Sequence, residues 1–170
     1  MISRRLLVGA ALALPCNALA ARREAWATYR NTRFGTSIEY PGRFRPGRPP
    51  DNNDGQAFEA DDGAKLSVWG SLNINNDDRA TLEAQMREQG QGPKEIYSYS
   101  ARGENWFVFS GRRGPDGLFY KRYLLSHRGA IINAFDIGYP EALKAEYDPI
   151  VTRMSKSLKP GRGYQTKGVP

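Results

Sequence analysis

The sequence predicts an α/β protein of the α+β kind: a single domain with a twisted antiparallel sheet of about six or seven strands, covered by helices on both faces. Two observations carry this prediction. Strand-like segments follow one another at residues 95–101, 105–111, 118–126 and 130–139, and the turns between them are too short for parallel crossovers. Apolar residues occupy both faces of these segments, which indicates a helix on each side.

The first twenty residues have the pattern of a secretory signal peptide. Arg4 and Arg5 precede an apolar run at residues 6–14, and Ala18 and Ala20 frame a small-x-small cleavage pattern. We therefore expect cleavage after Ala20 and a periplasmic or secreted mature protein, with a buried core helix as the alternative interpretation. The arginine pair leaves general secretion and twin-arginine export both open.

Cysteine use and apolar content bound the rest of the chain. Cys16 is the single cysteine, and Pro15 stands where a lipid-anchor signal requires a small residue. The mature protein is thus expected to fold without disulfides, as a single domain over residues 21–159 followed by a disordered basic tail at 160–170. No later stretch is apolar and long enough to span a membrane.

Charge is distributed in blocks along the chain. The net charge is +7, with +5 on residues 21–50, −6 on residues 51–100 and +6 on residues 101–170. Such blocks can steer a charged partner, although folding can also mix them into an ordinary solvated surface. Export argues against nucleic acid, so the expected partner is an envelope or periplasmic protein. The sequence indicates no oligomeric state.

The first half of the domain supplies further strands and one helix. Residues 36–40 have strand composition and end at a Pro-Gly pair, and a proline- and arginine-rich loop follows. Residues 56–60 and 65–72 are two strands joined by an Asp-Asp-Gly hairpin turn. Residues 79–90 form a short helix that Asp78 caps.

The last element is a helix whose apolar stripe covers one face of the sheet. A helical turn is expected to start at Tyr139 and Pro140. The helix then restarts at Asp148 and Pro149, with the aspartate as N-cap and the proline in the first helical position. The apolar stripe comprises Leu143, Tyr147, Ile150, Val151, Met154 and Leu158. We interpret this stripe as core rather than as a binding surface.

Two terminal motifs carry a resemblance to known proteins. The segment SIEYP occupies residues 37–41, and Ser157-Leu158 ends the stretch FDIGYPEALKAEYDPIVTRMSKSL. With the antiparallel middle, this layout resembles small exported proteins of alphaproteobacteria and the PsbP-like fold. That fold occurs in an extrinsic photosystem subunit, in mycobacterial lipoproteins and in a nuclear Ran-binding regulator. Its members mostly bind proteins or stabilise assemblies, so the resemblance implies a binding or accessory role but transfers no functional residue.

Motifs for catalysis are sparse. His127, the only histidine, lies in a turn between two strands beside Arg128 and Gly129, where no orienting partner for a general base is evident. The sequence contains no nucleophile elbow, no phosphate-binding glycine loop and no histidine and cysteine set for a transition metal. We therefore expect no catalytic residue, no metal and no cofactor.

A basic hairpin supplies the candidate binding residues. Arg112 and Arg113 precede a Gly-Pro-Asp-Gly turn, and Lys121 and Arg128 lie on the next strand and its following turn. Together with neighbouring tyrosines, these cations predict an anion-attracting surface for a partner. The leading hypothesis is a non-catalytic periplasmic binding or accessory protein.

Two alternatives to this role remain open. The negative block contains the loop acids Asp51, Asp54, Asp61, Asp62, Asp77 and Asp78. A converging pair of them would make a hydrolase site, and residues 50–61 resemble a calcium loop whose first ligand position holds proline. Ordinary turns rich in Asn, Asp and Gly explain the same residues. The other alternative is a small-ligand carrier with a pocket lined by Trp69 or Trp106.

Overall fold

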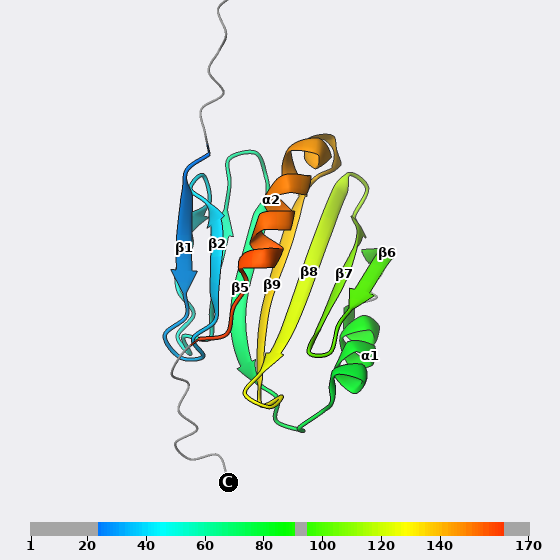
Figure 1. Ribbon diagram of the computed structural model, residues 1–170. Helices are drawn as coiled ribbons and strands as arrows, with labels where there is room; N and C mark the ends of the chain where they lie inside the picture. The colour runs from blue at the N-terminus through cyan, green and yellow to red at the C-terminus, as the bar shows by residue number, and fades with distance from the viewer. Residues whose placement is uncertain (1–23, 91–94, 162–170) are drawn as a thin grey trace, which may run out of the picture.

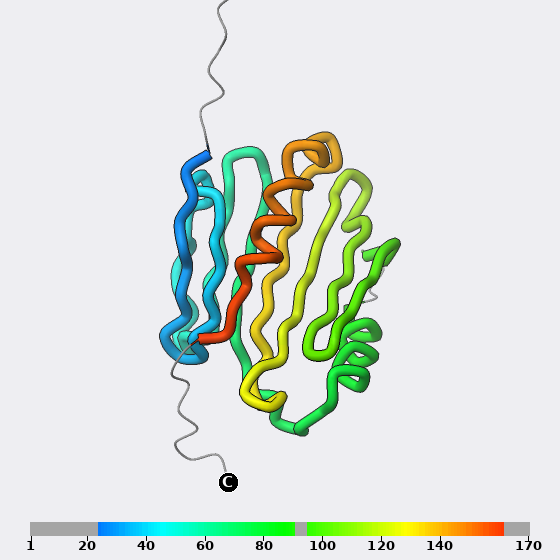
Figure 2. Tube along the Cα trace, in the orientation of Figure 1, coloured from blue at the N-terminus to red at the C-terminus, as the bar shows by residue number. Residues whose placement is uncertain are grey.

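The computed structural model of the protein describes residues 24–90 and 95–161. The predicted signal peptide at residues 1–20 and most of the predicted tail at 160–170 lie outside these ranges, so both stay predictions. In the described part, Figures 1 and 2 show one large sheet with a helix on each face and a strand pair at one end.

A seven-stranded antiparallel sheet forms the centre of the molecule and confirms the predicted α+β class. Its strands are β3 (Arg45–Pro46), β4 (Gly55–Glu59), β5 (Lys65–Leu72), β6 (Glu95–Arg102), β7 (Trp106–Arg113), β8 (Gly117–Ser126) and β9 (Ile131–Pro140). They lie in the order β3-β4-β5-β9-β8-β7-β6 (Figure 1). Short turns join β6 to β9 in sequence, as predicted. Pairing of β9 with all of β5 then joins the two halves of the chain into one sheet.

Two further strands form a separate pair. β1 (Trp26–Arg30) and β2 (Ser37–Pro41) are antiparallel, and β2 consists of the SIEYP segment. Ile38 of β2 is fully buried in the core beneath the C-terminal helix. The sequence analysis predicts neither β1 nor β3, and β3 has only two residues, within the proline- and arginine-rich loop.

Helix α2 (Lys144–Ser157) lies across the sheet face that Figure 1 shows in front. Its buried side chains are Tyr147, Ile150, Val151 and Met154, as the apolar stripe predicts. They pack in one core cluster with residues of β2, β5 and β9. Burial of each such side chain stabilises the fold by about 1.5–3 kcal/mol.

The structure corrects the expected break in this helix. β9 extends through Pro140, a 3-10 turn η1 (Glu141–Leu143) follows, and α2 then runs without interruption through Pro149. Asp148 is therefore not an N-cap, and its carboxylate instead accepts a hydrogen bond from Lys144 Nζ at 2.6 Å. A proline in the second turn removes only one backbone hydrogen bond, and the buried stripe on both sides of it keeps the helix continuous.

Helix α1 (Arg79–Gly90) lies on the opposite face of the sheet, over β7. It begins where the sequence predicts, because the backbone N–H of Thr81 donates a hydrogen bond to Asp78 Oδ1 at 2.7 Å. Leu82 is buried in a second core cluster that includes Phe107 and Phe109. Helices thus lie on both faces, and each covers only part of its face.

Candidate protein-docking face

Helix α2 leaves one end of its sheet face uncovered. It contacts β2, β9 and β8, while β7 and β6 extend beyond it towards the edge of the sheet (Figure 1). Strand register determines which side chains share this uncovered surface. We call the surface the open face, and its residues are Ile96, Tyr99, Trp106, Ser110, Arg112, Tyr120 and Arg122.

Two large apolar side chains of the open face point into solvent. Ile96 is 67% exposed and Tyr99 is 56% exposed, and both lie on β6. The other large apolar side chains with comparable exposure, Leu72 and Ile74, lie at the end of β5 and in the loop after it. Clustered exposed apolar residues mark interaction surfaces more often than isolated ones do.

An arginine and a tryptophan lie further along the same face, towards the other end of β7. The guanidinium of Arg122 lies over the ring of Trp106, with its carbon 4.6 Å from the ring centre. Its Nη1 donates to Ser155 Oγ of α2 at 3.3 Å, and the same oxygen lies 2.9 Å from the hydroxyl of Tyr120. The buried Nε of Arg122 has no hydrogen-bond partner within residues 24–90 and 95–161. Ser155 thus links helix α2 to the open face.

A groove separates α2 from β6 along the open face. Its volume is about 300 Å³, and Tyr99, Ser110 and Tyr120 line its sheet side. Lys144 and Thr152 line its helix side. The combination of aromatic, hydroxyl and charged groups is suited to contact with another protein surface.

The opposite face carries a compact group of paired charges. Arg113 Nε donates to Glu95 Oε1 at 2.8 Å, and its Nη2 lies 2.6 Å from Asp136 Oδ2. Lys121 Nζ donates to Glu95 Oε2 at 2.8 Å. We call these four residues the charge cluster. Burial alone would raise the pKa of Glu95, but the hydrogen bonds from Lys121 and Arg113 outweigh it and hold that pKa below its usual range.

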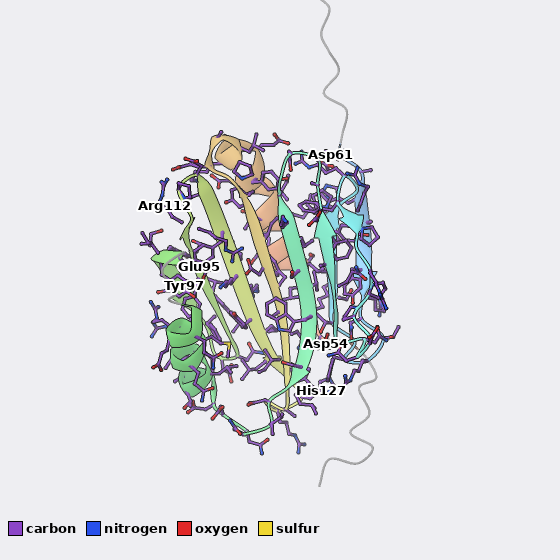
Figure 3. The ribbon with its side chains drawn as sticks, turned by 180° about the vertical axis from the view of Figure 1, so that it is seen from behind. Asp54, Asp61, Glu95, Tyr97, Arg112 and His127 are labelled. Carbon is purple, nitrogen blue, oxygen red and sulfur yellow. The ribbon has the colours of Figure 1, made fainter. Side chains whose placement is uncertain are left out.

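A neutral phenol adjoins the charge cluster. Burial, followed by the negative charge of Glu95, raises the pKa of Tyr97 to about 12. The Tyr97 ring stacks on Phe109 at 5.1 Å, and Figure 3 shows Tyr97 and Glu95 together near α1. The phenol keeps its proton at neutral pH, and the neighbouring charges neutralise one another. This arrangement of paired charges stabilises the sheet.

The structure separates the four predicted binding residues. Arg112 lies on the open face and forms a two-bond pair with Glu141, both bonds at 2.7 Å. Arg113 and Lys121 meet in the charge cluster, and Arg128 lies at the far end of the sheet, in the turn between β8 and β9. Neighbouring strand residues point to opposite faces, so Arg112 and Arg113 never share one surface.

Sequence reasoning named Arg112 and Trp106 of the open face, but it did not identify the exposed Ile96 and Tyr99. In the hairpin register, Arg112 lies opposite Leu118. Arg122 is four residues after Leu118 on the same strand, so Arg112 and Arg122 point to the same side of the sheet. That register follows from the length of the turn between the two strands, which the sequence shows. No sequence signal identifies Ile96 and Tyr99 as exposed, because their exposure depends on where α2 ends its cover.

The turn with the only histidine has an unusual backbone. His127 and Arg128 have φ of 52° and 59°, in the left-handed region that glycine favours. Both are exposed, as predicted for a hairpin tip, and Figure 3 shows His127 at the end of the sheet opposite Arg112. They line a polar cavity of about 500 Å³ together with Asn73 and Asn105.

The loop acids are spread over separate loops, and one adjacent pair, Asp77 and Asp78, lines the cavity that His127 also borders. Figure 3 shows Asp54 and Asp61 at opposite ends of the sheet. Asp61 pairs with Arg45, Asp62 accepts a hydrogen bond from the Tyr147 hydroxyl at 2.7 Å, and Asp78 caps α1. Pairing with Arg45 lowers the pKa of Asp61, whereas a general acid needs a raised one. No group of three potential metal-binding side chains occurs within the described ranges.

Of the two tryptophans of the carrier alternative, Trp69 borders a cavity, which lies beside a loop and not under a helix. Trp69 packs edge-on against Tyr123 at 6.1 Å and borders a cavity of about 270 Å³ beside the loop around Pro50. Trp106 is covered by Arg122 on the open face.

In the part of the chain that the structure describes, no helix is long and apolar enough to cross a membrane.

Comparison with known proteins places the fold. No family model and no curated protein sequence matches the chain. The solution structure of cyanobacterial PsbP (CyanoP) from Synechocystis sp. PCC 6803 is similar, with a TM-score of 0.61 and 14% identity, covering 83% of this chain and 95% of that one. The crystal structure of the Saccharomyces cerevisiae Ran-binding protein Mog1p is also similar, with a TM-score of 0.56 and 9% sequence identity. The match covers 80% of this chain and 95% of the Mog1p chain. These structures confirm the PsbP-like fold.

Proposed function

We propose that this chain is a non-catalytic binding or accessory protein, and that its open face docks a protein partner. The observation that carries the proposal is that exposed Ile96 and Tyr99 lie on the same sheet face as the Arg122–Trp106 pair, and that α2 leaves this part of the face uncovered. Aromatic, arginine and large apolar side chains of this kind are enriched at the centres of protein interfaces.

The side chains of the open face indicate what kind of surface a partner would present. Ile96 and Tyr99 require an apolar patch, and the groove beside them admits a projecting side chain. Arg112 and Arg122 are the cations of this face, so a partner with a carboxylate near the rim complements it. Mog1p, which has the same fold, is a Ran-binding protein, and this supports a protein-binding use of the fold.

Export belongs to the same proposal. The arginine pair, the apolar run and the Ala18-x-Ala20 pattern support cleavage after Ala20 and a periplasmic or secreted location. Sequencing the N-terminus of the protein from a periplasmic fraction tests this step. A first residue of Ala21 is expected, and a protein that retains Met1 and stays with the cytoplasm would contradict it.

Crosslinking in intact cells tests the docking face. The chain is expressed with its own N-terminus and a C-terminal tag, crosslinked gently, captured and analysed by mass spectrometry. The test variant combines Ile96→Ser with Tyr99→Ser. The matched control combines Leu72→Ser with Ile74→Ser, which removes two exposed apolar side chains at the other end of the sheet.

The two variants separate docking from general stickiness. We expect one stoichiometric envelope protein with the unmodified chain and with the control, and its loss with the test variant. Capture that survives Ile96→Ser with Tyr99→Ser, in a protein that remains folded by circular dichroism, would exclude the open face. Capture lost equally in both variants would assign the contact to non-specific apolar exposure.

A further inference from the structure

β6 is the long free edge of the sheet. It pairs with β7 on one side and with no other strand of the described chain, while the opposite edge is the two-residue β3. β6 has eight residues, so one side of its backbone presents a row of N–H and C=O groups to solvent. An edge of this length is a template for pairing with another strand.

Within residues 24–90 and 95–161, no strand pairs with the free edge of β6, although α1 contacts the strand through Glu83 with Arg102 and through Arg87 over the Tyr97 ring. α1 packs on β7, and Ser98, Tyr99 and Ser100 are exposed in succession. Edge strands are commonly protected by lysine or proline, and the β6 segment EIYSYSAR contains neither. A single bulge between Tyr97 and Tyr99 is the one irregularity in its pairing with β7.

We propose that β6 pairs antiparallel with β6 of a second copy of this chain. A twofold axis between Ser98 and Tyr99 places Glu95 of each copy opposite Arg102 of the other, so the two ends of the strand pair are charge-complementary. Glu95 and Arg102 also share a sheet face, because Glu95 is in register with Arg113 and Arg102 with Phe107. The same axis places Ile96 beside Ala101 of the second copy.

The existing contacts leave this pairing accessible. The Arg102 side chain is 58% exposed and lies 3.2 Å from Glu83 Oε1, so it can reorient across the edge at little cost. The Glu95 side chain is 13% exposed and directs its carboxylate to Arg113 of β7 and Lys121 of β8, so Arg102 of the second copy must extend across the edge to add a further hydrogen bond.

The proposed dimer extends the surface described above. An axis perpendicular to the sheet keeps both open faces on the same side, which makes one continuous platform of twice the width. The pairing itself uses backbone groups of β6 and the end charges, so it stands independently of the docking function. A monomeric protein would leave the open face unchanged as a docking surface.

Sedimentation velocity of the mature protein over a concentration series tests the pairing. We expect reversible dimers of the unmodified protein. Arg102→Glu places an acid opposite an acid at both ends and weakens the dimer about tenfold or more. Ser100→Lys adds two cations at the centre of the edge and has the same effect. The matched control, Arg128→Glu, makes the same charge change in the β8–β9 turn and leaves the dimer intact.

Three results would overturn the proposal. The first is a protein that stays monomeric up to about 1 mM. The second is a dimer that Arg102→Glu and Ser100→Lys leave unchanged, since it would use another surface. The third is a monomer whose capture of an envelope protein is abolished by Ser100→Lys, because the edge would then accept a foreign strand. Because Ile96 and Tyr99 lie on the paired edge, their serine variants are also sedimented, so that a loss of capture with the dimer intact reports on docking alone.

Discussion

The guanidinium of Arg122 lies over the ring of Trp106, 4.6 Å from its centre, and this contact joins two strands of the open face. Arg122 is on β8 and Trp106 begins β7, so the stack forms only because the hairpin register places both side chains on one side. A planar guanidinium stacks on an aromatic face, whereas a lysine ammonium does not have that shape. The pair therefore presents a rigid, preorganised cation to a partner.

Replacing Arg122 with lysine tests the value of this stack. Arg122→Lys retains the charge and removes the stacked contact, which is worth about 0.5–1 kcal/mol at an exposed site. We expect capture of the partner to weaken by about two- to fivefold, with a change in tryptophan emission. Arg112→Lys is the matched control, because Arg112 pairs with Glu141 and not with an aromatic ring. Equal losses in both variants would show that the stack on Trp106 contributes nothing specific, and unchanged capture by Arg122→Lys would reduce the role of Arg122 to its charge.

A buried polar pair fixes the strand pair onto the sheet. The Thr36 hydroxyl donates to Asn133 Oδ1 at 2.9 Å, and both residues are fully buried. Asn133 Nδ2 in turn donates to Leu124 O and Ser126 Oγ, which holds the amide in one orientation. The segment before β2 is thereby anchored to β9.

Removal of the Thr36 hydroxyl should destabilise the fold. Thr36→Val leaves the Oδ1 of Asn133 buried without this donor, at an expected cost of about 1–3 kcal/mol in the free energy of unfolding. Urea denaturation measures the difference. Thr28→Val, at an exposed position of β1, is the control and should change stability by less than about 0.5 kcal/mol. If Thr36→Val leaves the free energy of unfolding unchanged, a water molecule must donate to Asn133 Oδ1 in place of the hydroxyl.

The sequence predicts the sheet better than it predicts the surface that the sheet exposes. Residues 79–90 and the strand run from β6 to β9 carry local patterns, so their positions follow from capping, periodicity and short turns. Pro149 led to the wrong prediction of a helix start. The preference of proline for the first helical position contributes less free energy than the burial of the apolar side chains around it. Tyr99 is exposed because α2 covers the sheet only as far as β8. The position of a helix over a sheet is a tertiary property that leaves no pattern in the local sequence.

Glu95 should make the stability of the protein sensitive to acid. Its folded-state pKa is lowered below the ordinary 4.5, so its ion pairs stabilise the folded state above that value. The contribution is lost as the pH falls through the lowered pKa. We expect Glu95→Gln to destabilise the protein by about 1–3 kcal/mol at pH 7, with a smaller difference at acidic pH.

Urea denaturation at a series of pH values measures this dependence. Asp116→Asn, in the exposed turn between β7 and β8, is the control and should leave the profile unchanged. A difference between Glu95→Gln and the unmodified protein that stays constant down to acid would show that the carboxylate contributes through packing and not through its charge.

Replacing Pro149 distinguishes the continuous helix α2 from the broken helix that the sequence suggests. The two helices predict changes of opposite sign in the free energy of unfolding. Pro149 lies inside α2, so Pro149→Ala restores a backbone hydrogen bond and removes a ring from the helix interior. Proline also restricts the unfolded chain, an effect worth about 0.4–1 kcal/mol that the substitution loses. The net expectation is a gain of about 1–2 kcal/mol in the free energy of unfolding. A proline in the first helical position would give the opposite sign, because only the unfolded-state effect would remain. Pro115→Ala, in the exposed β7–β8 turn, provides that reference and should destabilise slightly in the same urea experiment.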